Sequence, residues 1–273
     1  MVGILALLAG CMPGPQPETL VDDLLVVAVV PSTPEVGAGE TVTTEIHLGL
    51  PNDTPVDLLV WSCFPLGEDT CLETGTENRV TVFEGAPGVS SVDQTVPVEI
   101  AGLLTATGEE FPIFLWSMAC ESGLCPLIED AKAGTVSEDR LVNPINELKT
   151  LPFDGVSLAA RTLWLSGLSE EERRKNPVVE ADFEVPTAIA AGESISLAFS
   201  VEEYGDTIDA FGYSLTGGFG AISSRVFEGQ VVLDWFAPEE VESSETTQVW
   251  VVFQGEAGGT AVWSSEWMVE GAE

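Results

Sequence analysis

Positive charge is what this sequence has least of. Nine of its 273 residues are Lys or Arg, against 45 Asp and Glu, so the formal net charge at pH 7 is −36. Such a surface repels phosphate backbones and anionic lipid headgroups, which excludes nucleic acid as a partner. Hydrophobic residues still make up 45% of the chain, enough for a packed core, so global disorder is excluded too. The length suits two domains or one large one.

Residue types that carry catalysis are also scarce. The single histidine, His47, falls beside Glu45 on the polar side of an alternating stretch. We therefore expect a solvent-facing imidazole rather than a general base. The sequence contains no Gly-x-Ser-x-Gly elbow, phosphate loop or His-Glu-x-x-His helix. A hydrolase built on two carboxylates stays open as an alternative, but the abundance of acids singles out no pair. We predict a non-catalytic protein with no catalytic residue, no metal ligand and no cofactor.

Apolar runs long enough to cross a bilayer are missing as well. The run from Gly3 to Ala9 is far shorter than the ~20 residues of a membrane helix, and it suits the core of a signal peptide. It leads into Leu-Ala-Gly-Cys, which ends at Cys11 and has the form of a bacterial lipobox, and then into a proline-rich stretch. We expect residues 1–10 to be a lipoprotein signal peptide, Cys11 to be lipidated, and residues 11–20 to be a tether. An ordinary secretory peptide and a buried N-terminal strand are the alternatives.

Cysteine is sparse, and the count of five is odd. Lipidation of Cys11 would remove one and leave an even set, Cys63, Cys71, Cys120 and Cys125. In an oxidising compartment such a set predicts two disulfides. A four-cysteine zinc site is the alternative, although the spacings are wider than those of zinc knuckles. Local bridges, Cys63–Cys71 and Cys120–Cys125, are favoured over pairing between two adjacent strands.

An internal repeat organises the rest of the chain. Ala-Gly-Glu-Thr-Val at 38–42 recurs as Ala-Gly-Glu-Ser-Ile at 191–195. The residues Val-Asp and Trp-Ser within 56–62 recur as Ile-Asp and Tyr-Ser within 208–214. Two copies are too few for a solenoid, which needs at least three stacked units. The repeat therefore indicates tandem domains of one fold.

Each copy has the pattern of antiparallel strands. After each Ala-Gly-Glu corner, apolar and polar residues alternate over 41–48 and 194–201, which predicts half-buried strands. The next strand of each copy carries an aromatic residue, Trp61 or Tyr213, which we expect to pack between two sheets. Short strands, frequent Gly and Pro turns and this aromatic are typical of an immunoglobulin-like sandwich. Further strands are predicted at 96–100, 112–117, 156–165, 231–236, 248–254 and 260–269, and a β-rich stretch that ends in proline begins each copy, at 25–31 and at 178–186.

The fold class predicted is all-β, with two tandem immunoglobulin-like antiparallel β-sandwiches and a short, partly helical insertion in the first. Residues 21–167 are expected to form the first sandwich, and the insertion lies near 127–150. Residues 168–177 form a charged, exposed linker, and residues 178–273 the second sandwich.

Several of these motifs together resemble the Ig-like-domain lipoproteins of diderm bacteria. They are the lipobox, the tether, the Pro-x-x-Gly-x-Gly-Glu-Thr-Val corner that begins at Pro34, Trp-Ser-Cys at 61–63, Arg-Thr-Leu at 161–163, Asn-Pro at 176–177 and Trp-Phe-Ala-Pro at 235–238. The motifs cover most of the chain, but they mark a fold rather than an active site.

The resemblance implies a non-catalytic cell-envelope protein that serves adhesion, scaffolding or partner binding. Its expected partners are the membrane, through the lipid, and an unknown envelope protein or glycan. Met12 occupies the position where an aspartate would resemble an inner-membrane retention signal, so we expect the outer membrane.

A calcium-stiffened module is the alternative function. Glu180, Asp182 and Glu184 would share one face of a strand, just after the acidic residues 170–172. Ca²⁺ binds such oxygen ligands. The cations at 173–175 lie in the same stretch and could neutralise the acids instead, so a solvated face is the default and no metal ligand is assigned.

Tryptophans near the C-terminus raise the question of a glycan platform. Trp263 and Trp267 fall on one face of a predicted strand, and Trp250 belongs to the neighbouring strand. Packing within the core is the ordinary explanation for large aromatics, and we expect it here.

Overall fold

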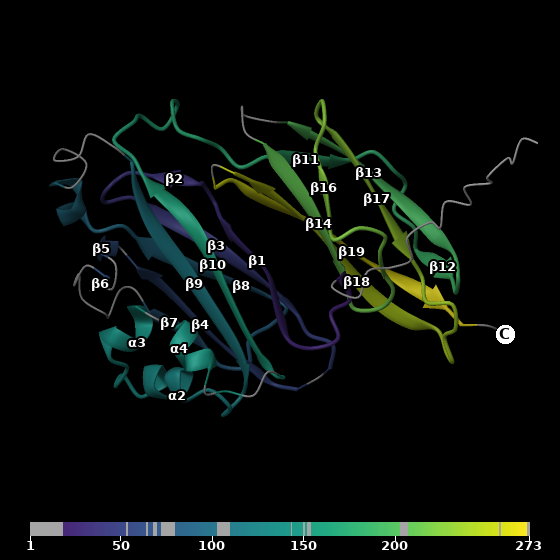
Figure 1. Ribbon diagram of the computed structural model, residues 1–273, viewed down its shortest axis with the longest axis horizontal. Helices are drawn as coiled ribbons and strands as arrows, with labels where there is room; N and C mark the ends of the chain where they lie inside the picture. Colours follow the sequence, from purple (N-terminus) through teal and green to yellow (C-terminus); the bar gives the residue numbers. More distant parts are fainter. Residues whose placement is uncertain are drawn as a thin grey trace, which may run out of the picture.

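The computed structural model describes most of the chain after residue 18. The described residues are 19–52, 54–63, 65–67, 70–71, 80–102, 110–142, 144–149, 151, 154–202, 207–256 and 258–271. They form mainly strands, with short helices gathered in one region (Figure 1). No helix within these ranges combines the length and the apolar character that crossing a membrane requires.

The first sandwich consists of two sheets that face each other. One has the strand order β1-β3-β8 and the other β2-β10-β9-β4-β7. The strands are β1 (Leu25–Pro31), β2 (Glu35–Val36), β3 (Thr41–Gly49), β4 (Val56–Cys63), β7 (Val80–Phe83), β8 (Val89–Thr95), β9 (Phe111–Glu121) and β10 (Val156–Leu165), besides a small separate pair, β5 (Pro65–Gly67) and β6 (Thr70–Cys71). Buried apolar side chains such as Val29, Ile46, Leu58, Val92 and Leu115 form one core cluster from both sheets.

The second sandwich repeats this plan. Its sheets have the orders β11-β13-β17-β15 and β12-β19-β18-β14-β16. The strands are β11 (Val178–Ala181), β12 (Ala188–Ala190), β13 (Ser194–Glu202), β14 (Ile208–Ser214), β15 (Gly218–Phe219), β16 (Ser223–Arg225), β17 (Gln230–Phe236), β18 (Glu245–Gly255) and β19 (Thr260–Glu270). Its core is rich in aromatics, among them Phe199, Trp235, Phe253 and Trp267.

Both units share the topology of an immunoglobulin-like sandwich. In each, the first strand is divided between the two sheets, and its second piece, β2 or β12, pairs in parallel with the last strand of the unit. The other pairings between the long strands are antiparallel. This strand order confirms the predicted fold class of two tandem Ig-like sandwiches.

The repeated Ala-Gly-Glu corner is the turn that passes the chain from one sheet to the other. Gly39 and Gly192 have φ values of +83° and +76°, a conformation that favours glycine. The backbone N–H of Gly39 donates to the carbonyl oxygen of Val96, just after β8, at 2.8 Å. The backbone N–H of Gly192 donates to the carbonyl oxygen of Pro238, just after β17, at the same distance. The repeat therefore recurs because both copies need the same tight corner.

Most predicted strands lie where they were expected. The ranges 25–31 and 156–165 coincide with β1 and β10, and the predictions at 112–117, 231–236, 248–254 and 260–269 fall inside β9, β17, β18 and β19. The strand predicted at 96–100 is wrong. Pairing with β3 ends at Thr95, and Val98–Ile100 form a 3₁₀ turn after Pro97, which has no N–H for a ladder. In the stretch 178–186 only Val178–Ala181 form a strand.

The helical insertion lies between β9 and β10. Its helices are α2 (Pro126–Lys132), α3 (Glu138–Val142) and α4 (Ile145–Leu148). They pack beside β4 and β7 on the outer side of the first sandwich (Figure 1). Lys132 of α2 fixes this cap by an ion pair of 2.8 Å with the buried carboxylate of Asp57 on β4. Burial acts to raise the pKa of Asp57, but the hydrogen bonds from Lys132 and Gly85 outweigh it, and the pKa is lowered.

The prediction that Trp61 and Tyr213 pack between the sheets is wrong. On β4, Leu58 and Val60 face the sandwich core, so Trp61 points to the opposite face, where the helices bury it. Its indole N–H donates to the carbonyl of Leu141 at 3.0 Å, and its ring stacks on Trp116 at 6.1 Å. Tyr213 likewise faces outward from β14 and packs with residues of the first sandwich. Both strands are covered on two faces, which the alternating pattern did not reveal.

His47 is also placed differently from the prediction. It is 8% exposed on β3, and its Nε2 lies 3.7 Å from Glu45 Oε2. Burial lowers the pKa of His47, and the opposing charge of Glu45 only partly offsets this. The imidazole is therefore a buried neutral group and not a solvated one.

A fall in pH is therefore expected to destabilise the protein through His47. Its pKa in the folded chain lies below the value of 6.5 in the unfolded chain, so the unfolded chain takes up the proton first. The contribution of neutral His47 to the free energy of unfolding is fully present above the pKa of the unfolded chain. It is lost as the pH falls through that pKa towards the lower pKa of the folded chain. Urea unfolding between about pH 7.5 and about pH 5.5, above the range of ordinary carboxylates, should show this loss. Since His47 is the only histidine, His47→Leu should flatten the dependence; an equal slope in both proteins would contradict it.

Candidate functional site

The two sandwiches are joined by an apolar interface. Figure 1 shows them side by side, with β1 of the first sandwich at the boundary. Strand β1 packs against β18 and β19 of the second sandwich. The buried members of the cluster are Val21, Val27, Ala28, Trp250 and Val252, and the half-buried ones are Leu25, Val30, Phe211, Tyr213, Leu215 and Val262. We call this cluster and the polar contacts around it the joint.

An irregularity in β1 allows it to serve both sandwiches. Its register with β3 shifts between Val26 and Ala28. As a result Val27 and Ala28 both join the interface cluster, while Val26 and Val29 belong to the core of the first sandwich. A bulge of this kind re-aims side chains without ending the strand.

Arg161 and Asn176 supply hydrogen bonds across the joint. Arg161, on β10, donates from Nε to the carbonyl of Gly258 at 3.1 Å and from Nη2 to that of Gly259 at 2.7 Å, both in the β18–β19 turn. Asn176 donates from Nδ2 to the carbonyl of Pro31 at 2.7 Å and accepts the N–H of Thr260 at 3.0 Å. One amide side chain therefore connects the end of β1 to the start of β19.

The chain just before β1 also lies against the second sandwich. The Val21 N–H donates to the carbonyl of Ser214 at 2.8 Å, and the Thr19 hydroxyl accepts the N–H of Phe219 at 2.8 Å. Thr19 and Leu20 fall in the stretch that the sequence predicts to be tether, so the end of that stretch is docked onto the second sandwich.

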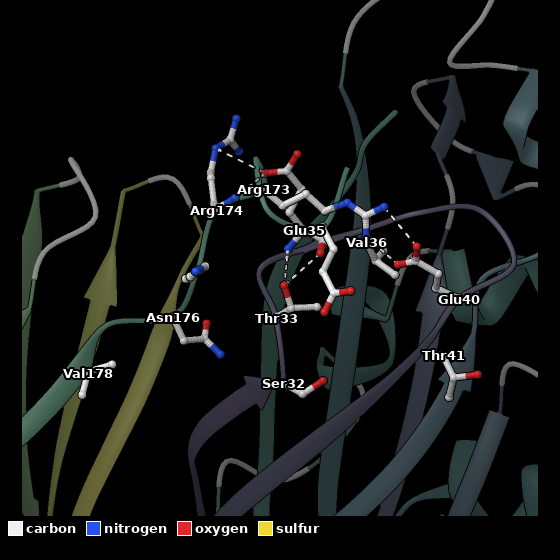
Figure 2. A pocket seen from close by; sticks show the side chains of 12 residues that line it. Ser32, Thr33, Glu35, Val36, Glu40, Thr41, Arg173, Arg174, Asn176 and Val178 are labelled. Carbon is white, nitrogen blue, oxygen red and sulfur yellow. Dashed lines mark hydrogen bonds and ion pairs between the residues drawn. The ribbon is translucent and has the colours of Figure 1, made fainter. Parts of the chain in front are cut away.

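A cleft of about 700 Å³ opens beside the joint and is lined by cations and acids (Figure 2). Arg173 forms a two-pronged ion pair with Glu40, with Nη2 at 3.0 Å from Oε1. The hydrogen bonds from Arg173 and from the Gly37 N–H lower the pKa of Glu40, and the pKa of Arg173 is raised in turn. These pairs tie the segment before the second sandwich to the corner between β2 and β3.

Arg174 makes the second set of contacts in this cleft. Its backbone N–H donates to Oε2 of the buried Glu35 at 2.9 Å, and its guanidinium pairs with Glu110 and lies over the ring of Trp164 at 5.6 Å. The sequence suggested that these cations could neutralise the acids of their own segment. In the structure Arg173 and Arg174 form ion pairs with acids of the first sandwich. Residues 168–172 are exposed, as predicted for the linker, whereas Arg173, Arg174 and Asn176 are partly buried.

The sequence contained a signal for this joint that its motifs did not reveal. Four of the nine cations in the chain, Arg161, Arg173, Arg174 and Lys175, fall between residues 161 and 175. In a chain of net charge −36, cations are scarce enough that such a concentration marks a place where acids must be neutralised.

Two of the predicted cysteine sites belong to the helical cap and not to the joint. Cys120, at the end of β9, is disulfide-bonded to Cys125, which precedes α2, with 6.1 Å between the Cα atoms. This is the local pairing that the spacing favoured, and it attaches the helical cap to the sheet. Cys63 is also disulfide-bonded, but the side chain of its predicted partner Cys71 lies outside the described residues, so that pairing stays a prediction. Cys11 and the signal peptide lie outside them too.

The acids considered for calcium are not gathered into one site. Strand β11 ends at Ala181, and Asp182 accepts a hydrogen bond from the hydroxyl of Ser200. Within the part of the chain that the structure describes, no three His, Cys, Asp or Glu residues lie close enough together to hold a metal ion.

The C-terminal tryptophans pack as the ordinary explanation predicted. Trp267 is buried in the second core and contacts Trp235 edge to face, with 5.4 Å between ring centroids. Trp263 is half-buried against Phe183 and Phe199. Trp250, at 1% exposure, lies in the joint. These rings fill cores and the interface.

Comparisons with known proteins give no family. No protein-family model and none of the curated proteins matches the sequence. Matches among solved structures include murine CRIg (8% identity, 36% of this chain, 99% of that one, TM-score 0.21). A tandem pair of titin Ig domains matches at 9% identity over 89% of this chain and 95% of that one, with TM-score 0.22. A tetra-tandem repeat from the extending region of a large adhesion protein matches at 11%, over 90% and 49%, with TM-score 0.24. Similarity this low carries no argument, so the fold assignment rests on the strand order.

Proposed function

We propose that this chain is a non-catalytic, lipid-anchored envelope protein that presents two Ig-like sandwiches as one rigid unit for scaffolding or partner binding. The joint is the observation that carries the proposal. A buried apolar cluster and the Arg161 and Asn176 hydrogen bonds connect the sandwiches, and two arginine ion pairs hold the linker against the first sandwich. Inter-domain motion is the default expectation where an interface lacks a hydrophobic core, and this interface contains a buried apolar cluster. A fixed arrangement suits a protein that holds surfaces at a set distance and angle.

The residues of the joint support a structural role. Its arginines are engaged by carboxylates and carbonyls, and its aromatic rings are packed. The only histidine, His47, is buried on β3 opposite Ala28 of β1. Such groups fix geometry and do not present a nucleophile with its base, which is what acyl or glycosyl transfer would require.

The lipid anchor rests on the lipobox ending at Cys11, and the outer-membrane location rests on Met12, which follows it. Two or three acyl chains, at about 0.8 kcal/mol per buried methylene, would hold the chain stably at a membrane. Because Thr19 and Val21 dock onto the second sandwich, an anchor at Cys11 would attach the unit beside its joint.

Replacing Cys11 with serine is expected to abolish lipid labelling and to move the protein from the membrane fraction to the soluble fraction. A serine hydroxyl cannot take the thioether-linked lipid. Fractionation after growth with labelled palmitate measures both effects. Cys63→Ser serves as the control, because it also removes one sulfur and should leave labelling intact. A Cys11→Ser protein that stays labelled and membrane-bound would end this proposal.

A further inference from the structure

We propose that the outer edge of β8 in the first sandwich is a docking site for an extended, basic segment of a partner protein, which adds to the sheet as a further antiparallel strand. This gives the proposed partner binding a surface and rests on it. The sheet order is β1-β3-β8, so this edge lies across the sheet from β1 and the joint. The helical cap packs on the other sheet of the sandwich and leaves this edge to one side.

Alternate backbone groups of β8 point away from its neighbour β3. At one end of the ladder the Leu48 N–H donates to the carbonyl of Gly88 at 2.7 Å. At the other end the Val96 N–H donates to the carbonyl of Glu40 at 2.9 Å. Hydrogen-bonded pairs alternate along an antiparallel ladder, so the even-numbered residues of β8 bond to β3. Both N–H and C=O point to the outer side at the odd-numbered residues, which are Val89, Ser91, Asp93 and Thr95. Among the described residues no strand pairs with β8 on that side.

The second sandwich shows what can occupy this position in the fold. On β8, Asp93 accepts a hydrogen bond from the hydroxyl of Thr43 on β3 at 2.6 Å. On β17, Asp234 accepts the same bond from Ser196 on β13 at 2.5 Å, so the two strands correspond. The chain itself covers the outer edge of β17 with β15 and the residues after it, where the carbonyl of Asp234 accepts the N–H of Gly220 at 2.9 Å. In the described part of the first sandwich no segment does this for β8, so β8 offers a partner the edge that β17 does not.

Two buried polar side chains of β8 stand behind this edge. Ser90 and Gln94 point into the sandwich and are 4% and 6% exposed. Within the described part of the chain, neither the Ser90 hydroxyl nor the Gln94 amide group forms a hydrogen bond. A buried polar group without a partner is costly, so these two favour a neighbour that can bond to them. A strand added at the edge places its inward side chains beside them, and serine or threonine hydroxyls there can both donate and accept.

Charge decides which partner fits. Asp93 is exposed at the edge, and Glu45 is exposed on the same face of the neighbouring β3. The three strands of this sheet contain no lysine or arginine. Lysine or arginine at alternate positions of an added strand would therefore be attracted to its outward face. A second copy of this chain, at −36, and anionic lipid would be repelled.

The test uses the full chain in detergent at physiological ionic strength and a labelled heptapeptide, acetyl-Lys-Thr-Lys-Val-Lys-Thr-Lys-amide, as the probe. Its lysines match the outward face, and its inward threonine, valine and threonine match Gln94, Val92 and Ser90. We expect saturable binding in fluorescence anisotropy. In the free chain the outward amides of Ser91 and Asp93 should exchange fast, and saturating probe should slow them. The amide of Val92, which faces β3, should exchange slowly in both states.

Two methylated probes separate strand pairing from simple attraction of charge. In an antiparallel arrangement, as β15 has with β17, the N–H groups of the third and fifth residues of the probe face β8, and those of the second and sixth face away. N-methylation at the third and fifth residues should weaken binding at least ~10-fold, or about 1.4 kcal/mol. N-methylation at the second and sixth should leave the affinity of the parent peptide. Equal affinities of the two methylated probes would overturn the proposal.

Asp93→Lys should weaken binding of the unmethylated probe at least ~10-fold. Its matched control is Asp234→Lys, which makes the same charge change at the corresponding exposed residue of β17 and should bind like the wild type. Circular dichroism checks that both variants fold, and the exchange measurement on the wild type stands without them.

Equal effects of the two lysine variants would count against the edge. Slow exchange of Ser91 and Asp93 in the free chain would overturn the proposal, because the chain itself would then cover the edge. A dimer that the probe dissociates, or phosphatidylcholine vesicles that displace the probe, would also overturn it, since the edge would then serve a second copy or a lipid. The rigid joint and the lipid anchor at Cys11 are tested by other measurements, so each of these outcomes leaves the proposed scaffolding role standing.

Discussion

Replacing Trp250 with alanine is expected to lower the free energy of unfolding by about 3–5 kcal/mol and to uncouple the two sandwiches. Trp250 is 1% exposed, and it fills the joint from the second sandwich opposite Val27 and Ala28 of β1. The truncation would leave a cavity between the sandwiches that neither can close without moving. We expect one cooperative calorimetric transition for the wild type and two for the variant.

A double-mutant cycle tests whether this effect belongs to the joint. Val27→Ala on the first sandwich and Trp250→Ala on the second should show a coupling energy of at least about 0.5 kcal/mol, because the residues share one cluster. Trp235→Ala removes a ring of the same kind from the second core. It should be strongly destabilising but should show no coupling to Val27. Additive effects of Val27→Ala and Trp250→Ala, with a single transition retained, would contradict the rigid joint.

Replacing Trp61 with alanine is expected to cost about 3–5 kcal/mol as well, but in the helical cap. The variant loses the stack on Trp116 and leaves the carbonyl of Leu141 without its indole donor. Helices α2, α3 and α4 rest on this outer face of β4, so they should exchange amide hydrogens faster and become sensitive to proteolysis.

The matched variant for the cap is Trp61→Phe. It keeps a ring in the cluster but removes the hydrogen bond to Leu141 and part of the indole volume, so its cost should be about 1–3 kcal/mol, below that of Trp61→Ala. Exchange in β1 and β19, at the joint, should stay unchanged in both variants. Faster exchange there, or helices that remain protected in Trp61→Ala, would mean that the cap does not depend on this residue.

The strand plan of the protein could be read from its sequence because it depends on local patterns. Alternation over β3 and β13 reflects the pleat of a strand, and a corner glycine with positive φ leaves its mark at 39 and again at 192. The Cys120–Cys125 bridge spans a sequence separation of only five. Each of these features is decided by residues that are neighbours in the chain.

The joint could not be read in the same way, although part of its signal was present. Arg161 and Asn176 bond to groups 84 to 145 positions away, and nothing near them in the sequence names those partners. Their clue was compositional, namely the gathering of rare cations between residues 161 and 175. The motifs Arg-Thr-Leu and Asn-Pro marked the right residues without indicating what they do.

Local sequence patterns are enough to establish an acidic, all-β protein of two similar sandwiches with a helical insertion in the first. What covers the outer faces of these sandwiches follows from tertiary packing alone. Strand β4 is buried at every position, and β18 contains the apolar run Val249–Phe253, so both needed cover on a second face. The first sandwich takes its cover from its own helices, and the second takes it from β1. Burial of apolar area is non-directional, so a sequence can show that a face must be covered, but the packing of distant segments decides which one covers it.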